Sequence, residues 1–334
     1  MSAKRVAITG ADGFIGSHVA EALVEAGYEV KALVQYNSFN SWGWLDHSNK
    51  KLTSQIEIVS GDVRDAQAMR DLVIGVDVVM HLASLIAIPY SYHAPSSYVD
   101  TNINGTLNLL QAARGSRVEH FIHTSTSEVY GTAQFVPITE EHPLNAQSPY
   151  AATKIAADQL ALSFHRSFDM PVSIIRPFNT FGPRQSARAV IPTVISQLLA
   201  GKTEIMLGNL DPTRDFTYVE DMAAAFIAMI NNHKTIGQII NFGSGFEISI
   251  GDMAGAIRDE INPVAEIKLD PSRLRPPNSE VDRLWASIAK ARQRTDWSPS
   301  YSGLDGFRTG IEKTVRWFRD SKNLSFYKTD TFNT

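Results

Sequence analysis

Two groups of polar residues in this chain have the chemistry needed to take a hydride from an alcohol. Tyr150 and Lys154 lie four residues apart, so a helix would place both side chains on one face, with the ammonium near the phenol. Upstream, a run of hydroxyl residues ends in a carboxylate at Thr126, Ser127 and Glu128. If the two groups share one pocket, that pocket holds a hydroxyl donor, a carboxylate, a phenol and an ammonium.

Removing a hydride from an alcohol also requires a base for the hydroxyl proton. Tyrosine is a poor base at neutral pH, because its ordinary pKa is about 10 and lowering that pKa to neutrality requires roughly 4 kcal/mol. We expect the Lys154 ammonium and a positively charged nicotinamide ring to supply this free energy together. In the alternative interpretation, Tyr150 is an ordinary amphipathic-helix residue with its ring on the core and its hydroxyl in water.

A glycine-rich segment near the N-terminus provides a place for such a cofactor. A short apolar run ends at Thr9, and Gly10, Gly13 and Gly16 follow it where an amphipathic segment over residues 14–25 begins. A strand, a glycine turn and a helix in this order let the backbone approach a dinucleotide pyrophosphate at the positive end of the helix. Glycine turns in α/β proteins also occur for steric reasons alone, and that alternative stays open here.

Apolar runs alternate with amphipathic segments through the first half of the chain, which predicts a parallel sheet with helices on both faces. The fold class that follows is α/β, a Rossmann-type doubly wound parallel sheet with a smaller C-terminal substrate-binding lobe. We expect the cofactor domain at 1–176 and mainly the lobe at 177–334, with segments of the second part returning to the first. The expected strands cover residues 5–9, 29–34, 56–59, 76–81, 121–125 and 172–176.

The composition excludes several classes of function. The formal net charge of −4 provides no broad basic field, so neither nucleic acid nor a membrane surface is expected as a partner. The chain has no cysteine, and no cluster of histidines and carboxylates has the spacing of metal ligands, so we expect no metal. No apolar secretory segment precedes the first expected strand, and we therefore expect a cytoplasmic location.

The order of the motifs resembles that of the extended short-chain dehydrogenase/reductases, and specifically the nucleotide-sugar epimerase/dehydratase family. The resemblance spans nearly the whole chain. Beyond the glycine turn and the Thr126, Tyr150 and Lys154 set, it rests on Gly61-Asp62, His81-Leu82-Ala83, Asn102-Ile103-Asn104-Gly105-Thr106, Arg176-Pro177-Phe178-Asn179, Gly182-Pro183-Arg184, Arg214-Asp215-Phe216-Thr217-Tyr218-Val219, Asn241-Phe242-Gly243 and Arg275-Pro276.

The resemblance implies roles for the residues that match. Tyr150 would be the catalytic base, with Lys154 lowering its pKa and holding the nicotinamide ribose, and Thr126, Ser127 and Glu128 would complete the catalytic set. Cofactor contacts are implied for Gly10, Asp12, Gly13, Phe14, Ile15, Gly16, Gln35, Asp62, Val63, Leu82, Ala83, Ser84, Asn102, Thr124, Tyr150 and Lys154.

The resemblance also implies a substrate and an assembly. The substrate would be a nucleoside-diphosphate hexose or N-acetylhexosamine, bound by Asn179, Arg184, Arg214 and Arg275. Helices over roughly 96–114 and 147–168 would pair across a two-fold axis, which implies a homodimer.

The carboxylate of Glu128 bears on which reaction of the family is expected. Oxidation at C4 of a hexose makes the C5 proton acidic and places the C6 hydroxyl β to the ketone, so a base at Glu128 can take the proton while water leaves. Hydride return to C6 then gives a 4-keto-6-deoxy sugar without net redox change. The chain resembles the 4,6-dehydratases, which have Thr-Ser-Glu in the GDP-mannose enzymes and Thr-Asp-Glu in the dTDP-glucose enzymes. Because Ser127 replaces that Asp, we expect Glu128 to act as base and then as acid.

Three alternatives to a dehydratase stay open. A nucleotide-sugar decarboxylase of the UDP-xylose synthase type also has Thr-Ser-Glu, and a 4-epimerase would only rotate the 4-keto sugar before the hydride returns. A non-catalytic NAD-binding regulator would share the fold, although such proteins typically lose the Tyr or the Lys. Among dehydratases, the chain most resembles those that act on GDP-N-acetylglucosamine in legionaminic acid synthesis.

The residues after the second expected strand bear on the form of the cofactor. Residues 33–38 contain neither the acidic residue that would bind the adenosine ribose of NAD nor an Arg for a 2′-phosphate. We expect NAD, because no cluster of basic residues is available there for a phosphate. NADP stays open as the alternative.

Overall fold

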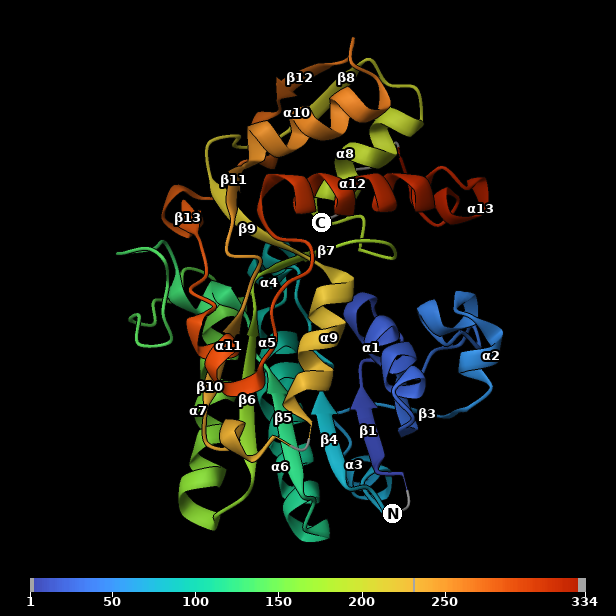
Figure 1. Cartoon of the computed structure of the whole chain (residues 1–334), viewed down its shortest axis with the longest axis vertical. Helices are drawn as coiled ribbons and strands as arrows, with labels where there is room; N and C mark the ends of the chain where they lie inside the picture. The colour runs from blue at the N-terminus through green and yellow to red at the C-terminus, as the bar shows by residue number, and fades with distance from the viewer. Residues whose placement is uncertain (1–2, 231, 330–334) are drawn as a thin grey trace.

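A parallel sheet of seven strands forms the lower part of the molecule in the computed structural model, which describes residues 3–230 and 232–329 (Figure 1). The strand order is β10-β6-β5-β4-β1-β2-β3, so the direction of winding reverses between β1 and β4. Ligands bind at such a reversal in doubly wound folds. The strands are β1 (Arg5–Thr9), β2 (Glu29–Gln35), β3 (Ile56–Gly61), β4 (Val78–His81), β5 (His120–Thr124), β6 (Val172–Pro177) and β10 (Ile239–Phe242).

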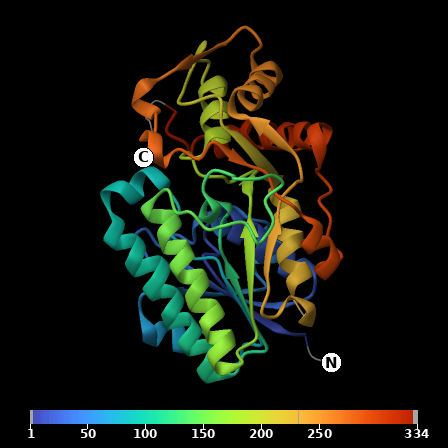
Figure 2. The same ribbon diagram turned by 90° about the vertical axis from the view of Figure 1, so that its left-hand side faces the viewer.

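Helices cover both faces of this sheet because successive residues of its strands point to opposite sides. In β1, Val6 and Ile8 pack in the cluster that includes residues of α1 and α9, whereas Ala7 packs in the cluster that includes residues of α3, α6 and α7. Figure 2 shows α6 and α7 side by side on the second face. These helices are α1 (Phe14–Glu25), α3 (Ala66–Leu72), α6 (Gly105–Ser116), α7 (Pro149–Phe168), α9 (Val219–Met229) and α11 (Ala289–Thr295).

The predicted α/β class and Rossmann-type parallel sheet are confirmed, and the six expected strands differ from the observed ones only at their ends. The strand β10 is hydrogen-bonded in parallel to β6, so a segment far along the chain completes the sheet. The helix α9, which also comes late in the chain, packs against α1. The sheet therefore draws on residues well beyond Arg176.

A smaller lobe lies above the carboxyl ends of the strands (Figure 1). Its aromatic core includes Phe181, Phe216, Tyr218 and Phe307, all buried. Two small sheets, ordered β11-β9-β13 with β7 paired to β9, and β12-β8, pack with four helices. The elements are β7 (Asn179–Phe181), α8 (Val190–Leu199), β8 (Glu204–Leu207), β9 (Thr213–Tyr218), β11 (Glu247–Ser249), α10 (Ile250–Ile261), β12 (Glu266–Leu269), β13 (Arg283–Leu284), α12 (Gly303–Phe318) and α13 (Ser321–Leu324).

Short helical segments connect the larger elements. A π-helical stretch η2 joins α5 to α6 without a break, and such stretches are frequent at functional sites. A 3₁₀ turn, η3, follows β5 directly and contains Glu128. The short segments are η1 (Gly43–His47), α2 (Lys50–Thr53), α4 (Ile88–His93), α5 (Pro95–Tyr98), η2 (Val99–Asn104), η3 (Ser127–Tyr130), η4 (His233–Thr235), η5 (Pro271–Arg273) and η6 (Pro277–Ser279).

Candidate functional site

The start of α7 fixes where Tyr150 and Lys154 lie. The Ser148 hydroxyl accepts a hydrogen bond from the Ala151 backbone NH at 3.1 Å, and Pro149 occupies the first helical position. The helix then places Tyr150 and Lys154 one turn apart, both buried. The expectation that the two residues share one face of a helix agrees with this geometry.

The ammonium of Lys154 joins α7 to the end of β5. Its Nζ donates a hydrogen bond of 2.6 Å to the carbonyl oxygen of Thr124. Burial lowers the pKa of Lys154 to about 8, and the carboxylate of Asp158 opposes that shift. Lys154 is therefore held at the carboxyl end of β5 with a readily lost proton.

In the protein alone, the phenol of Tyr150 favours its protonated form over the phenolate. Burial raises its pKa, the nearby Thr126 hydroxyl lowers it, and the negative charge of Glu128 raises it further. The Lys154 ammonium is engaged with the Thr124 carbonyl. Formation of the phenolate therefore requires additional positive charge in the pocket, and an oxidised nicotinamide ring would supply it.

The turn after β5 presents the hydroxyl and the carboxylate. Thr126 caps η3, since its Oγ1 accepts a hydrogen bond of 3.2 Å from the Glu128 backbone NH. Ser127 is buried, whereas Thr126 and Glu128 are only partly buried. The charge of Glu128 acts on both Tyr150 and Arg214, so this carboxylate lies near the catalytic helix and near the lobe. The structure thus brings Thr126, Glu128 and Tyr150 together.

A buried network of charged and polar side chains contacts this turn and the end of β5. Asp158 Oδ2 accepts hydrogen bonds from Ser125 Oγ at 2.7 Å and Arg176 Nη2 at 2.8 Å. Arg176 Nη1 in turn donates to the Tyr130 hydroxyl at 2.9 Å. Burial opposes ionisation of Asp158, but the neighbouring His123 and Arg176 hold its pKa below the ordinary value. The network connects α7, β6, the end of β5 and η3.

The glycine turn is built for close backbone approach. Gly10 has φ +71°, and a Cβ there would lie 2.8 Å from the Ala83 backbone nitrogen. A Cβ on Gly16 would lie 2.0 Å from the Gly10 carbonyl oxygen. Gly13 caps α1 and places the free amides of that helix end at the carboxyl end of β1. These residues fit a dinucleotide pyrophosphate.

The loop after β4 is tied to the glycine turn and to η2. Thr9 Oγ1 accepts hydrogen bonds from the backbone NH groups of Leu82 and Ala83, each at 3.1 Å. On the other side, Asn102 Oδ1 accepts one from Ser84 Oγ at 2.9 Å. Asn102 Nδ2 donates to Thr153 Oγ1 of α7 at 3.0 Å. Asn102 therefore holds the predicted cofactor loop against the catalytic helix.

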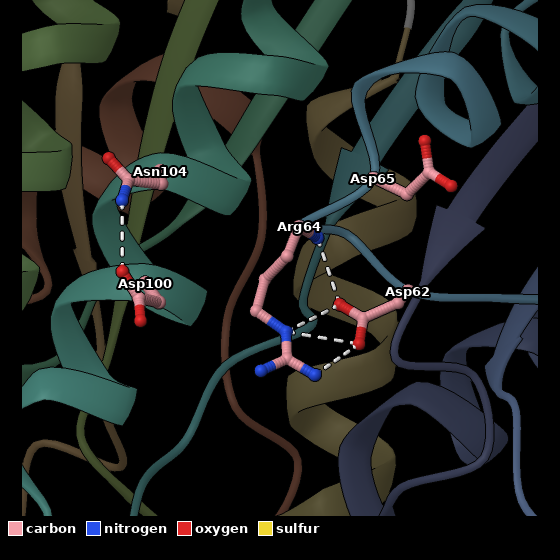
Figure 3. Close-up of a pocket in the computed structure, with 5 residues that line it drawn as sticks. All are labelled: Asp62, Arg64, Asp65, Asp100 and Asn104. Atoms are coloured by element: carbon pink, nitrogen blue, oxygen red, sulfur yellow. Dashed lines mark hydrogen bonds and ion pairs between the residues drawn. The ribbon is translucent and has the colours of Figure 1, made fainter.

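Asp62 and Arg64 line a cavity of about 490 Å³ together with Asp65, Asp100 and Asn104 (Figure 3). Arg64 Nε donates to both carboxylate oxygens of Asp62 at 3.0 Å, and this contact lowers the pKa of Asp62. Val63 is buried against Gly105, where a Cβ would lie 2.8 Å from the valine methyl. The cavity lies beside the end of β3, where the resemblance implies a cofactor contact at Asp62.

The remaining predicted cofactor residues differ in their surroundings. Gln35 is exposed at the end of β2, and its backbone NH lies 3.4 Å from Asp12 Oδ2. Phe14 packs against the core of the lobe, whereas Ile15 packs against the core of the sheet. The Thr124 hydroxyl is buried and has no hydrogen-bond partner among residues 3–230 and 232–329.

Arg214 and Arg275 converge on one carboxylate. Glu280 Oε1 lies 3.6 Å from Arg214 Nη2 and 3.5 Å from Arg275 Nη1. Burial lowers the pKa of Arg214, while the charges of Glu128 and Glu280 oppose that shift. Two neighbouring guanidinium groups are suited to a diphosphate. Sequence reasoning missed Glu280, since no motif marks it.

The other two predicted substrate residues lie in different surroundings. Asn179 starts β7, and its buried side-chain oxygen has no hydrogen-bond partner in the part of the chain that the structure describes. Arg184 forms an ion pair with Glu21 at 2.8 Å and donates to Ser17 Oγ at 3.2 Å. Both partners of Arg184 belong to α1, so its contacts join the lobe to the sheet domain and do not include the Arg214 and Arg275 pair.

Residues 3–230 and 232–329 contain neither a metal-binding cluster nor a membrane-spanning helix. No group of three or more histidines and carboxylates there is placed to hold a metal ion. Within the same residues, no helix combines the length and apolar character that crossing a bilayer requires.

Replacing Lys154 by methionine should change how stability depends on pH. The folded-state pKa of about 8 lies below the unfolded value of about 10.4, so the unfolded chain binds more protons between these values. The wild-type protein should therefore gain up to about 1.4 kcal/mol per pH unit over this window, relative to Lys154→Met. Urea unfolding of both proteins from about pH 7 to about pH 10 measures the difference. A constant difference would contradict the lowered pKa.

Comparison with known proteins agrees with this geometry. The model of the family described as GDP-mannose 4,6 dehydratase matches residues 7–314. A dTDP-glucose 4,6-dehydratase of Streptomyces antibioticus is 31% identical over 327 residues, covering 94% of this chain and 92% of the relative. A UDP-N-acetyl-alpha-D-glucosaminuronate decarboxylase of Bacillus cytotoxicus is 33% identical over 331 residues, covering 96% and 99%.

Solved structures extend the comparison. A UDP-glucuronic acid 4-epimerase from Bacillus cereus, in complex with UDP-glucuronic acid and NAD, has a TM-score of 0.85 at 28% identity, covering 97% of this chain and 100% of that one. Dehydratases, decarboxylases and epimerases thus all occur among the relatives. The chain belongs to the GDP-mannose 4,6 dehydratase family, a nucleotide-sugar-modifying branch of the extended short-chain dehydrogenase/reductases.

Proposed function

We propose that this protein is an NAD-dependent nucleotide-sugar 4,6-dehydratase. The observation that carries the proposal is the placement of Glu128, a carboxylate whose charge acts on both Tyr150 and Arg214. A 4-epimerase needs no base at this point, because it only rotates the 4-keto sugar. A carboxylate near both the phenol and the substrate arginine is suited to a second proton transfer, at the carbon next to the ketone.

Two side chains, Tyr150 and Glu128, carry out the proton transfers of the proposed reaction. Bound NAD would supply the acceptor for the C4 hydride and the donor of that hydride to C6. Tyr150 takes the proton of the C4 hydroxyl, and Lys154 and Thr126 support its phenolate form. Glu128 then removes the C5 proton, which the new C4 ketone has made acidic, and protonates the hydroxyl that leaves from C6. One water is lost, and after hydride return and reprotonation at C5 the product is a 4-keto-6-deoxy sugar.

Arg214 and Arg275 are proposed to bind the diphosphate, with Asn179 closer to the sugar. NAD is proposed because the Bacillus cereus relative contains it and because no cluster of basic residues follows β2. The glycine turn, the loop of Leu82, Ala83 and Ser84, and Asp62 would hold it.

Mass analysis of reaction products tests the reaction class. Purified protein, incubated with UDP-, GDP- and dTDP-linked hexoses and N-acetylhexosamines, should convert one of them to a product lighter by one water. Loss of carbon dioxide from a uronic acid would show a decarboxylase instead, and an isomer of unchanged mass would show an epimerase. A protein that binds NAD and converts none of these sugars would be a regulator.

The variant Glu128→Gln should separate oxidation from elimination. It keeps the size of the side chain and removes the base, so bound cofactor should still be reduced slowly while water release stops. Absorbance near the band of the reduced nicotinamide, recorded together with product mass, measures both steps. Water release at the wild-type rate would remove Glu128 from the mechanism.

We also propose that the protein forms a homodimer through α6 and α7. Both helices lie on the outside of the sheet domain, and α7 leaves Ala152, Gln159 and Ser163 exposed in the single chain. Light scattering should give about twice the chain mass of 36.8 kDa. A mass equal to one chain at micromolar concentration would contradict this proposal.

A further inference from the structure

One segment of the lobe reaches down to the catalytic helix. Residues 275–280, here named the arm, begin with Arg275, include η6 and end with Glu280. The arm thus carries one of the two guanidinium groups and the carboxylate that joins them. Its position decides whether Arg275 lies beside Arg214.

Gln147 forms hydrogen bonds to the arm. It stands three positions before Tyr150, outside the site residues expected from the sequence. Its Nε2 donates hydrogen bonds to the backbone oxygens of Glu280 at 2.7 Å and Asn278 at 3.3 Å. In return, Ser279 Oγ donates to the Gln147 carbonyl oxygen at 2.6 Å. Each of these bonds crosses from the start of α7 to the arm.

The same side chain also holds the segment that follows the catalytic turn. Gln147 Oε1 accepts a hydrogen bond of 2.6 Å from the Thr132 backbone NH. Gly131, at φ +62°, makes room for it, since a Cβ there would lie 2.5 Å from that oxygen. One amide therefore connects three segments: the turn that contains Glu128, the start of the helix of Tyr150, and the arm.

We propose that Gln147 is a positioning residue that holds the arm against the catalytic helix, so that Arg275 and Arg214 face the diphosphate of the substrate together. This proposal rests on the proposed function, in which those two arginines bind the diphosphate. Arg214 keeps its own hydrogen bond to the Thr213 carbonyl, at 2.9 Å, and does not need Gln147. Arg275 lies on the arm and depends on it.

The substitution Gln147→Met tests the proposal without adding charge. It preserves the length of the side chain and removes all three hydrogen bonds of the amide. Calorimetric titration should show the affinity for a nucleoside diphosphate weakened by roughly tenfold, the scale of one net hydrogen bond. The probe is whichever of UDP, GDP and dTDP the wild-type protein binds most tightly. NAD affinity should stay at the wild-type value, the thermal midpoint should fall by no more than a few degrees, and KM should rise more than kcat falls.

Two further variants make the test specific. Ser279→Ala removes the bond from the arm to the Gln147 carbonyl, together with the contact of Ser279 Oγ with the Tyr92 hydroxyl at 2.6 Å. It should therefore lower the affinity for the same diphosphate, and it decides the matter if Gln147→Met does not fold. Gln55→Met is the matched control, because the exposed side-chain amide of Gln55 donates to the Lys51 carbonyl of α2, within the same short segment.

Unchanged diphosphate affinity in a folded Gln147→Met protein would overturn the proposal, as would equal weakening in Gln55→Met or no diphosphate binding by the wild-type protein. The readout is binding and not turnover, so it is independent of whether the sugar product has lost water. A failure of the proposed dehydratase reaction and a failure of the arm proposal would therefore be distinguished.

Discussion

The buried ion pair between Asp158 and Arg176 is the constraint on which the site depends. Both side chains are almost fully buried, and their charges are stabilised by each other, by His123 beside Asp158, and by hydrogen bonds to Ser125 and Tyr130. Removing one partner of such a pair typically costs about 3–5 kcal/mol, because the other charge stays buried without compensation. Asp158 lies one turn after Lys154 on α7, and Arg176 lies on β6. The ion pair therefore fixes α7 against β5, β6 and η3.

The electrostatics of the pocket follow from this arrangement. Burial lowers the pKa of Lys154 to about 8 and raises that of Tyr150, so near neutral pH the phenol stays protonated while Lys154 keeps its charge with a smaller margin than an exposed lysine. Glu128 adds a negative charge that opposes phenolate formation and stabilises Arg214. The charges of this pocket are stabilised most by a cationic ring beside the phenol and an anionic diphosphate beside the arginines. Chemistry at Tyr150 is thereby coupled to the presence of both ligands.

Much of the fold could be predicted from the sequence because the apolar strands of a parallel sheet stand out from their amphipathic helices. The glycine turn and the pairing of Tyr150 with Lys154 were also predictable, because local spacing along the sequence determines them. Contacts between distant segments could not be predicted. Glu280 meets Arg214 through the return of the arm, and Arg184 meets Glu21 through packing of the lobe on α1. Nor does any local pattern show that Trp44, after β2, packs on Trp317 and Tyr327 of the C-terminal segment.

The most direct test of the central claim follows a single hydrogen atom. A nucleotide hexose carrying deuterium at C4 should give a 4-keto-6-deoxy product with that deuterium in the C6 methyl group of the same molecule, because the hydride leaves C4 and returns at C6. Nuclear magnetic resonance of the product locates it. Deuterium recovered at C4, with or without inversion, would show that the hydride returned to the carbon it left, and would contradict elimination at Glu128.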